Sequence, residues 1–213
     1  MIRIVVHSPK GGVGKTTLAT NIALFLARQG HNVWALDLAG GGMMAEFLHG
    51  TKEFSNKQRS NAVTVDEMGE LPLKLPGARK FDYAVADTDD YYKILASLID
   101  KKRIGWRAIA PILPADQDQT GLIKIPKETS ELMTVGTLAL DESPKLCVVM
   151  NKCPQQEWEQ RIQEVSKAMQ DCAVRSLLSD VWIPQAESRY HPYFIDQPEF
   201  WEAIERLLVS IGV

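Results

Sequence analysis

The sequence predicts an α/β fold, in which helices cover both faces of a doubly wound, mostly parallel sheet. Three observations lead to this fold class. Short, nearly continuous apolar runs alternate along the chain with segments of helical periodicity. Such runs are typical of strands that are buried on both faces, as in parallel sheets. Several runs also end in a polar residue, and a glycine-rich loop follows the first of them.

The apolar runs predict six strands, over residues 2–6, 33–37, 81–88, 106–113, 145–151 and 181–184. Helices are predicted over 16–29, 91–99, 121–133 and 155–169, and from Pro198 towards the C-terminus. Pro126 must kink or restart the third of these helices.

The stretch 51–79 is polar, contains two prolines and shows poor periodicity. We interpret it as a variable connection with one short helix.

The composition fits a single globular domain over residues 1–213. Hydrophobic residues make up 45% and charged residues 24%, so a packed core is expected rather than disorder. The net charge of −3 gives no support to nucleic-acid binding through overall charge. No window approaches the roughly 18 apolar residues of a membrane span, and the three cysteines have no metal-ligand spacing. Without a secretory signal, we expect a cytoplasmic protein with reduced thiols.

The stretch HSPKGGVGKTT, residues 7–17, predicts a phosphate-binding loop. The N–H groups of a glycine-rich turn can point inward at an anion, and the following helix adds the positive end of its dipole. Lys15 would reach the β- and γ-phosphates, and the Thr16 hydroxyl would ligate Mg²⁺. The alternative is a glycine turn with an incidental lysine. A chance match to K-G-G-x-G-K-T-T, however, is on the order of one in a million per chain.

The loop departs from the usual pattern G-x-x-x-x-G-K-[ST], because Pro9 replaces its first glycine and Lys10 precedes the next two. KGGVGKTT instead resembles the deviant Walker A signature of the ParA/MinD family of ATPases. The order of motifs is similar along almost the whole chain, and least so over 51–79.

The resemblance implies a P-loop NTPase fold that binds ATP and Mg²⁺ and forms a homodimer, face to face across two nucleotides. Lys10 would then reach the phosphates of the partner subunit and act in catalysis with Lys15. A solvated surface lysine is the alternative for Lys10. The implied nucleotide-binding residues of the loop are Lys10, Gly11, Gly12, Val13, Gly14, Lys15, Thr16 and Thr17.

Two acids end predicted strands. Asp87 resembles a Walker B acid, which would hold Mg²⁺ through a water; a helix N-cap is the alternative. Asp37 resembles the first, catalytic acid of the family's D-x-D motif, but Ala39 stands in place of the second. Hydrolysis is therefore expected to be slow and partner-stimulated, or silenced. Asp89 or Asp90 could supply the missing carboxylate or could cap the next helix.

The base site is assigned by resemblance to Asn151, at the end of the strand over 145–151, and to Pro184. A strand-ending asparagine is otherwise an ordinary turn residue. Asn151 and Lys152 also match the start of the guanine motif N-K-x-D, but Pro154 occupies the acid position, so adenine is favoured.

Three functions remain open at this stage. The first is an ATP-dependent dimeric switch that partitions or positions a cargo such as a plasmid, with a ParB-like adaptor. The second is a hydrolysis-poor ATP-binding scaffold for a conjugation or secretion apparatus. The third is a ligase like dethiobiotin synthetase, which usually lacks a lysine matching Lys10.

Nonspecific DNA is a candidate partner for the first function, and a membrane is not, because the C-terminal segment carries three glutamates and a single arginine. The candidate DNA-binding cations are Lys101, Lys102, Arg103, Lys124, Lys127, Arg175 and Arg189; solvated surface charges are the alternative.

Overall fold

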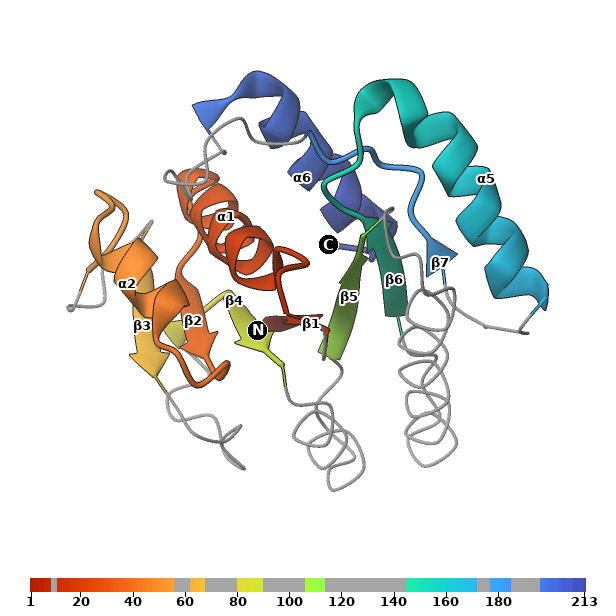
Figure 1. The fold of residues 1–213 in the computed structure, drawn as a ribbon. Coiled ribbons are helices and arrows are strands. Elements are labelled where there is room, and N and C mark those ends of the chain that lie inside the picture. Colours follow the sequence, from red (N-terminus) through yellow and green to blue (C-terminus); the bar gives the residue numbers. More distant parts are fainter. Residues whose placement is uncertain are drawn as a thin grey trace.

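The computed structural model describes residues 1–8, 11–55, 62–67, 80–89, 106–113, 145–171, 177–184 and 196–213. They form a seven-stranded sheet in the order β3-β2-β4-β1-β5-β6-β7, in which every pair of neighbours is parallel (Figure 1). The strands are β1 Ile2–His7, β2 Val33–Asp37, β3 Val63–Glu67, β4 Tyr83–Thr88, β5 Trp106–Ile112, β6 Lys145–Met150 and β7 Leu177–Leu178. The helices are α1 Lys15–Arg28, α2 Met43–His49, α5 Gln155–Asp171 and α6 Pro198–Ser210.

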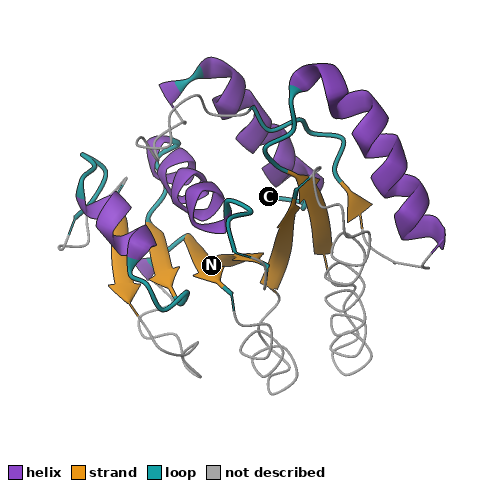
Figure 2. Cartoon of the chain, in the orientation of Figure 1, coloured by secondary structure: helices purple, strands orange, loops and turns teal. Residues whose placement is uncertain are grey.

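Helices lie against both faces of this sheet, as the sequence predicts (Figure 2). One apolar core joins the sheet to α1, α2 and α6, and includes Ile22, Met44 and Ile204. A second core on the opposite face joins the sheet to α5 through Val165 and Met169. The predicted α/β, doubly wound parallel fold is thereby confirmed.

Helix α1 is buried around nearly its whole circumference. Every residue from Leu18 to Ala27 is buried, because α1 contacts α2 and α6 as well as β1, β2 and β4. A helix that is apolar on all sides is expected in such a central position. The loop that precedes α1 is therefore attached to the most enclosed helix of the described fold.

The strand register brings polar residues together at one edge of the sheet. His7 pairs with Thr88 between β1 and β4, and Asp37 pairs with Asp87 between β2 and β4. Parallel strands place their carboxyl ends at the same edge, which is where ligands bind in such folds. The glycine loop after β1 begins at this edge.

The structure corrects the interpretation of the chain between β2 and β4. A short helix, α2, precedes the stretch 51–79, and the strand β3 lies within it. β3 was missed because its sequence, VTVDE, alternates only briefly between apolar and polar residues and ends in two acids. Its pairing with β2, and a hydrogen bond from Trp34 Nε1 to Asp66 Oδ2 of 2.7 Å, provide the tertiary contacts that short stretches need.

The prediction of a strand over 181–184 is wrong. The last parallel strand is β7, and its ladder with β6 continues only to the bond from Ser179 N–H to the Val148 carbonyl. The Ser179 hydroxyl then accepts the N–H of Val181, which turns the chain out of the ladder. Val181 and Ile183 are still buried in the first core. Their apolar character therefore indicates burial and not strand pairing.

The predicted helices over 91–99 and 121–133 lie outside the described residues. Within the described ranges, no helix has the length and apolar character that crossing a bilayer would require.

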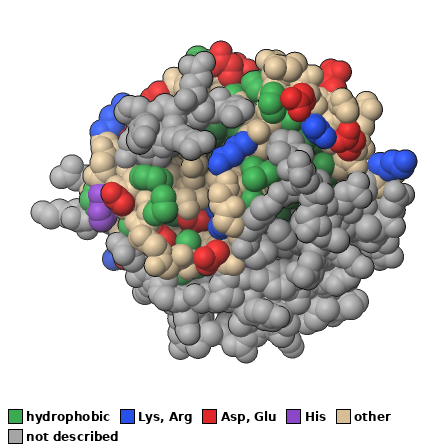
Figure 3. All heavy atoms as spheres, in the orientation of Figure 1, with side chains coloured by type: hydrophobic (Ala, Val, Ile, Leu, Met, Phe, Trp, Pro, Cys, Tyr) green, Lys and Arg blue, Asp and Glu red, His purple; other side chains and the backbone are tan. Residues whose placement is uncertain are grey.

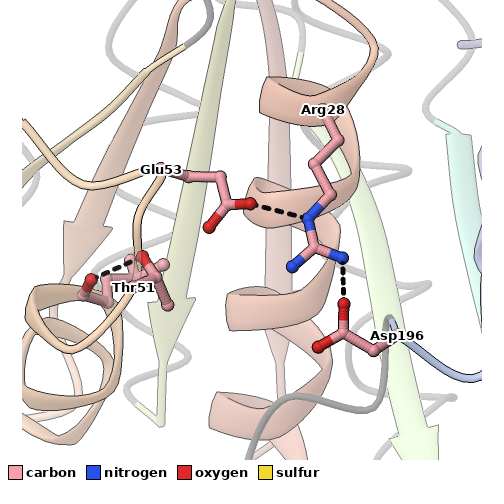
Figure 4. Close-up of polar contacts among 5 residues, drawn as sticks. Arg28, Thr51, Glu53 and Asp196 are labelled. Atoms are coloured by element: carbon pink, nitrogen blue, oxygen red, sulfur yellow. Dashed lines mark hydrogen bonds and ion pairs between the residues drawn. The ribbon is translucent and has the colours of Figure 1, made fainter.

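An ion triad fixes the end of α1 that is remote from the loop. Arg28 Nε donates to Glu53 Oε1 at 2.8 Å, and Arg28 Nη1 donates to Asp196 Oδ1 at 2.6 Å (Figure 4). Glu53 is 8% exposed, whereas the Asp196 side chain is 69% exposed. The two bonds join α1 to the segment after α2 and to the start of α6, but only Glu53 is a buried partner.

We predict that Arg28→Met lowers the free energy of unfolding by about 1–3 kcal/mol, because it leaves the buried Glu53 carboxylate without its partner. Asp196→Asn removes the exposed partner and should change it by less than about 0.5 kcal/mol. Urea unfolding of both variants at pH 7 measures the difference. Equal losses would show that burial of Glu53 does not govern the energy of the triad.

Candidate phosphate and magnesium site

The glycine loop passes directly into α1. Gly14 is the N-cap residue, with a φ of 89°, and Leu18 N–H donates to its carbonyl at 2.9 Å. This backbone conformation favours glycine. A Cβ at Gly14 would also collide with Nδ2 of Asn151. The loop therefore needs glycine at this position both for its turn and for its packing against the residue after β6.

Thr16 in the first turn of α1 reaches the end of β4. Its Oγ1 donates to Asp87 Oδ2 at 2.6 Å, across 71 residues of sequence. Asp87 is fully buried, and Lys15 is 9% exposed. The sequence predicted Thr16 and Asp87 as the magnesium residues, and the structure brings them into contact.

Burial raises the pKa of Asp87 to about 6. The hydrogen bond from Thr16 and the charge of Lys15 lower that pKa, whereas the neighbouring Asp37 and Asp89 carboxylates raise it. The second oxygen, Oδ1, is buried and has no hydrogen-bond partner among the described residues. A buried carboxylate with one unpartnered oxygen lowers the stability of the protein when no ligand is bound.

This arrangement fits a magnesium ion beside bound phosphates. Mg²⁺ prefers oxygen ligands, keeps several of its waters and binds proteins through one or two carboxylates together with phosphate oxygens. A hydroxyl and a carboxylate at the start of a helix, next to a lysine and a glycine turn, supply that donor set. Thr16 and Asp87 would hold the ion, and Lys15 would face the phosphates.

Asp37 is placed at the same edge but already has a partner. Its Oδ2 accepts the N–H of Ala45 at 3.0 Å, and the residue is 3% exposed. Ala45 lies in the first turn of α2, where backbone N–H groups have no acceptor within the helix, and Asp37 supplies one. Ala39 lies two residues beyond, half-buried, in a turn where Gly40 and Gly42 have positive φ. The catalytic role of Asp37 stays a prediction.

Asn151 contacts the loop from the end of β6. Its Nδ2 donates to the Val13 carbonyl at 2.8 Å, and its backbone N–H donates to Ile112 at 2.8 Å. Lys152, which we did not predict as a site residue, donates from Nζ to the Gly12 carbonyl at 2.7 Å. The N-K pair at the end of a strand was the signal for Lys152, but we considered it only as part of a base motif.

Pro184 is half-buried in a segment that packs beside Asn151. Trp182 Nε1 donates to the Cys153 carbonyl at 2.9 Å, which places residues 181–184 next to the loop after β6. The contacts of Asn151 and Pro184 with a base stay predictions.

The remaining predicted residues of the loop are Gly11, Gly12 and Val13 in the turn before α1, and Thr17 in the first turn of α1. Gly11 and Gly12 are exposed, Val13 is buried and Thr17 is half-buried, with its carbonyl accepting Asn21 Nδ2. Lys10 and the seven candidate DNA-binding cations lie outside the described residues.

Comparison with known proteins shows which family this chain belongs to. Residues 4–189 match the family model described as the CobQ/CobB/MinD/ParA nucleotide binding domain, which confirms the predicted resemblance to ParA and MinD. A curated relative, the cytosolic Fe-S cluster assembly factor Nubp2 homolog of Drosophila persimilis, is 49% identical over 70 residues. That match covers 33% of this chain and 25% of the relative, so the chain spans only about a quarter of the relative's length.

Solved structures share the whole fold at low identity. The MinC:MinD complex of Aquifex aeolicus gives a TM-score of 0.66 at 15% identity, covering 100% of this chain and 97% of the other. The structure of pNOB8 ParA bound to nonspecific DNA gives a TM-score of 0.57 at 14% identity, covering 99% of this chain and 98% of the other.

Cobyrinic acid a,c-diamide synthase from Mycobacterium smegmatis, with an ATP analogue and magnesium bound, gives a TM-score of 0.58 at 15% identity, covering 99% and 93%. ATP and Mg²⁺ are the cofactors that the sequence of the present chain predicts.

We predict that Asp87→Asn stabilises the protein without nucleotide or magnesium at pH 8 by roughly 1–3 kcal/mol. The native pKa of about 6 lies above the ordinary value of 3.8, so the cost of ionising Asp87 in the folded protein grows between these two pH values and is complete above about pH 6. The gain from Asp87→Asn should therefore shrink as the pH falls from 6 and be lost below the ordinary pKa of 3.8. Urea unfolding at pH 8 and at pH 4.5 measures this decrease.

The exposed carboxylate of Glu202 on α6 provides the control, because Glu202→Gln should give no such pH-dependent gain. Destabilisation by Asp87→Asn at both pH values would mean that the bond from Thr16 outweighs the cost of burying the charge.

Proposed function

Since this chain belongs to the CobQ/CobB/MinD/ParA family of nucleotide-binding domains, we propose that it is an ATP-dependent dimeric switch of the ParA type. In this proposal it partitions or positions a cargo, such as plasmid DNA, and a ParB-like adaptor stimulates its turnover. One observation carries the proposal: the Thr16 hydroxyl and the buried Asp87 carboxylate meet at 2.6 Å directly after the glycine loop. Phosphates and magnesium would explain both the buried charge and its unpartnered oxygen.

Each residue of the site has a role that follows from its position. Gly14 allows the turn that exposes backbone N–H groups to phosphate oxygens, and Lys15 offsets their charge. Thr16 and Asp87 would hold the magnesium ion. When bound, Mg²⁺ would supply positive charge that offsets the charge developing on the phosphates during transfer to water. Lys10 would contribute a second cation from the partner subunit, which makes ATP binding and dimerisation one event.

DNA as a partner is supported by one fold neighbour, a ParA bound to nonspecific DNA. The described surface does not add to that support. In Figure 3, acidic and basic side chains are interspersed over the described parts of this face, and Lys and Arg stand singly rather than in a patch. The candidate cations in the remaining ranges therefore need a direct test.

We predict that the protein is retained on nonspecific duplex DNA at low salt with ATP–Mg²⁺, and is not retained with ADP–Mg²⁺ or without nucleotide. Lys15→Ala should abolish retention, because the phosphates lose their cation within the subunit. Co-sedimentation or a DNA-coated surface measures the bound fraction. Since phosphate contacts release counterions, retention should weaken steeply as salt increases.

Lys10→Ala separates binding from dimerisation in the same experiment. It should still bind ATP, as measured by calorimetry, but remain monomeric by light scattering and lose DNA retention. Wild-type protein that dimerises on ATP and yet never binds DNA would contradict the DNA-carpet model and direct attention to a protein cargo.

The second candidate function is a scaffold that closes on ATP and barely hydrolyses it. Ala39 favours it, because no carboxylate stands at this position to orient the attacking water. The Fe-S cluster assembly factors match only 22% to 33% of this chain, so their function is not extended to it.

We predict that Ala39→Asp raises ATP turnover by roughly 10- to 100-fold, as a positioned base or water-orienting acid does. Ala39→Asn is the matched control, because it adds nearly the same volume without the charge. Steady-state phosphate release measures both variants against the wild type. Fast wild-type turnover with no gain from Ala39→Asp would exclude the scaffold and show that another carboxylate takes this role.

A further inference from the structure

Two consecutive residues after β6 hold two consecutive carbonyls of the glycine loop. Lys152 Nζ donates to the Gly12 carbonyl at 2.7 Å, and Asn151 Nδ2 donates to the Val13 carbonyl at 2.8 Å. About 140 residues of sequence separate the two partners in each pair. We call this pair of contacts the β6 clamp.

The backbone of the clamp is strained. Lys152 has a φ of 56°, and it is the non-glycine residue with positive φ in the described part of the chain. A side chain in this left-handed conformation is disfavoured by contact between Cβ and the backbone, and such residues cluster at functional sites. Lys152 N–H also donates to Asn151 Oδ1 at 2.9 Å, which fixes the orientation of the Asn151 amide. The strain therefore serves to aim both side chains at the loop.

Holding a carbonyl also aims the N–H of the same peptide. In a planar trans peptide, the C=O and the following N–H point in opposite directions, and the described residues contain no cis peptide. Lys152 pulls the Gly12 carbonyl towards β6, so the Val13 N–H must point away from it. Asn151 does the same for the Val13 carbonyl and the Gly14 N–H. Two N–H groups of the loop are thereby turned to the side opposite the clamp.

We propose that Asn151 and Lys152 are positioning residues that pre-orient the N–H groups of Val13 and Gly14 towards a polyphosphate. This inference deepens the proposed function and rests on it. Without the clamp, either peptide could rotate and present a carbonyl to the phosphates, which would repel them. The ammonium of Lys152 also adds a positive charge close to the loop. The amide of Asn151 then makes one hydrogen bond to the protein through its nitrogen and one through its oxygen, and both fix its orientation towards the loop.

The test compares a ligand with a base and a ligand without one. Binding of ATP–Mg²⁺ and of inorganic triphosphate–Mg²⁺ is measured by calorimetry for the wild type and for Lys152→Met. The clamp predicts that the variant binds both ligands about 5- to 10-fold more weakly, the loss expected for one solvent-exposed hydrogen bond. Asn151→Ala should weaken both ligands in the same way. The exposed Lys167 on α5 supplies the control, and Lys167→Met should change neither affinity.

Two further substitutions separate the donor from the strain. Lys152→Arg keeps a cationic donor and should recover most of the affinity. Lys152→Gly relieves the positive φ but removes the donor, so it should bind as weakly as Lys152→Met. If strain alone set the affinity, Lys152→Gly would bind at least as tightly as the wild type, and the clamp would be excluded.

Hydrogen exchange on the nucleotide-free protein gives an independent measurement. Amides over residues 13–18 should exchange faster in Lys152→Met than in the wild type or in Lys167→Met. Unchanged exchange and unchanged affinities would overturn the clamp, as would weaker binding of ATP with normal binding of triphosphate. Wild-type protein that binds neither ligand would instead refute the proposed function, and the exchange experiment would still decide whether the clamp exists.

Discussion

The hydrogen bond from Thr16 to Asp87 joins the first turn of α1 to the end of β4, across the edge of the sheet where β1 enters the glycine loop. Its length of 2.6 Å leaves little freedom in how α1 sits over the sheet. The burial of α1 against strands on one side and helices on the other follows from the same placement. A change in the tilt of α1 would separate the two side chains and disturb the core that α1 shares with α2, α6 and the sheet.

The Asp87 carboxylate in this contact is in an electrostatically unfavourable position. Asp87 is fully buried, one of its oxygens has no partner in the described fold, and Asp37 lies beside it in the neighbouring strand. Such an arrangement sacrifices stability in the protein without a ligand. A cation held by Asp87, as proposed above, would offset this cost, and stability and ligand affinity would then be coupled through a single carboxylate.

The sequence was sufficient for the parts that depend on local pattern or on a rigid motif. Central strands such as β1 and β4 are apolar throughout, and the residues from Gly11 to Thr16 define a loop with one known use. β3 could not be predicted, because five residues ending in two acids become a strand only through pairing with β2. Residues 181–184 were wrongly predicted as a strand, because their apolar pattern reflects burial in the core and not pairing with a neighbouring strand.

The same distinction holds in the site. Thr16 and Asp87 were each predicted as magnesium residues, because a hydroxyl after the loop lysine and an acid at the end of a strand are the residue types that such a site needs. Lys152 was not predicted, because its contribution depends on a backbone conformation and on a carbonyl about 140 residues away, and the N-K pair alone indicates neither of them.

One edge of the sheet ends in β7, a strand of only two residues that is followed by a side-chain-capped turn and the exposed Asp180. In the described part of this edge, an incoming strand would find a ladder of two residues to extend and a charge beside it. Both features disfavour edge-to-edge pairing, the route by which open sheets associate into fibres, along the described residues of that side.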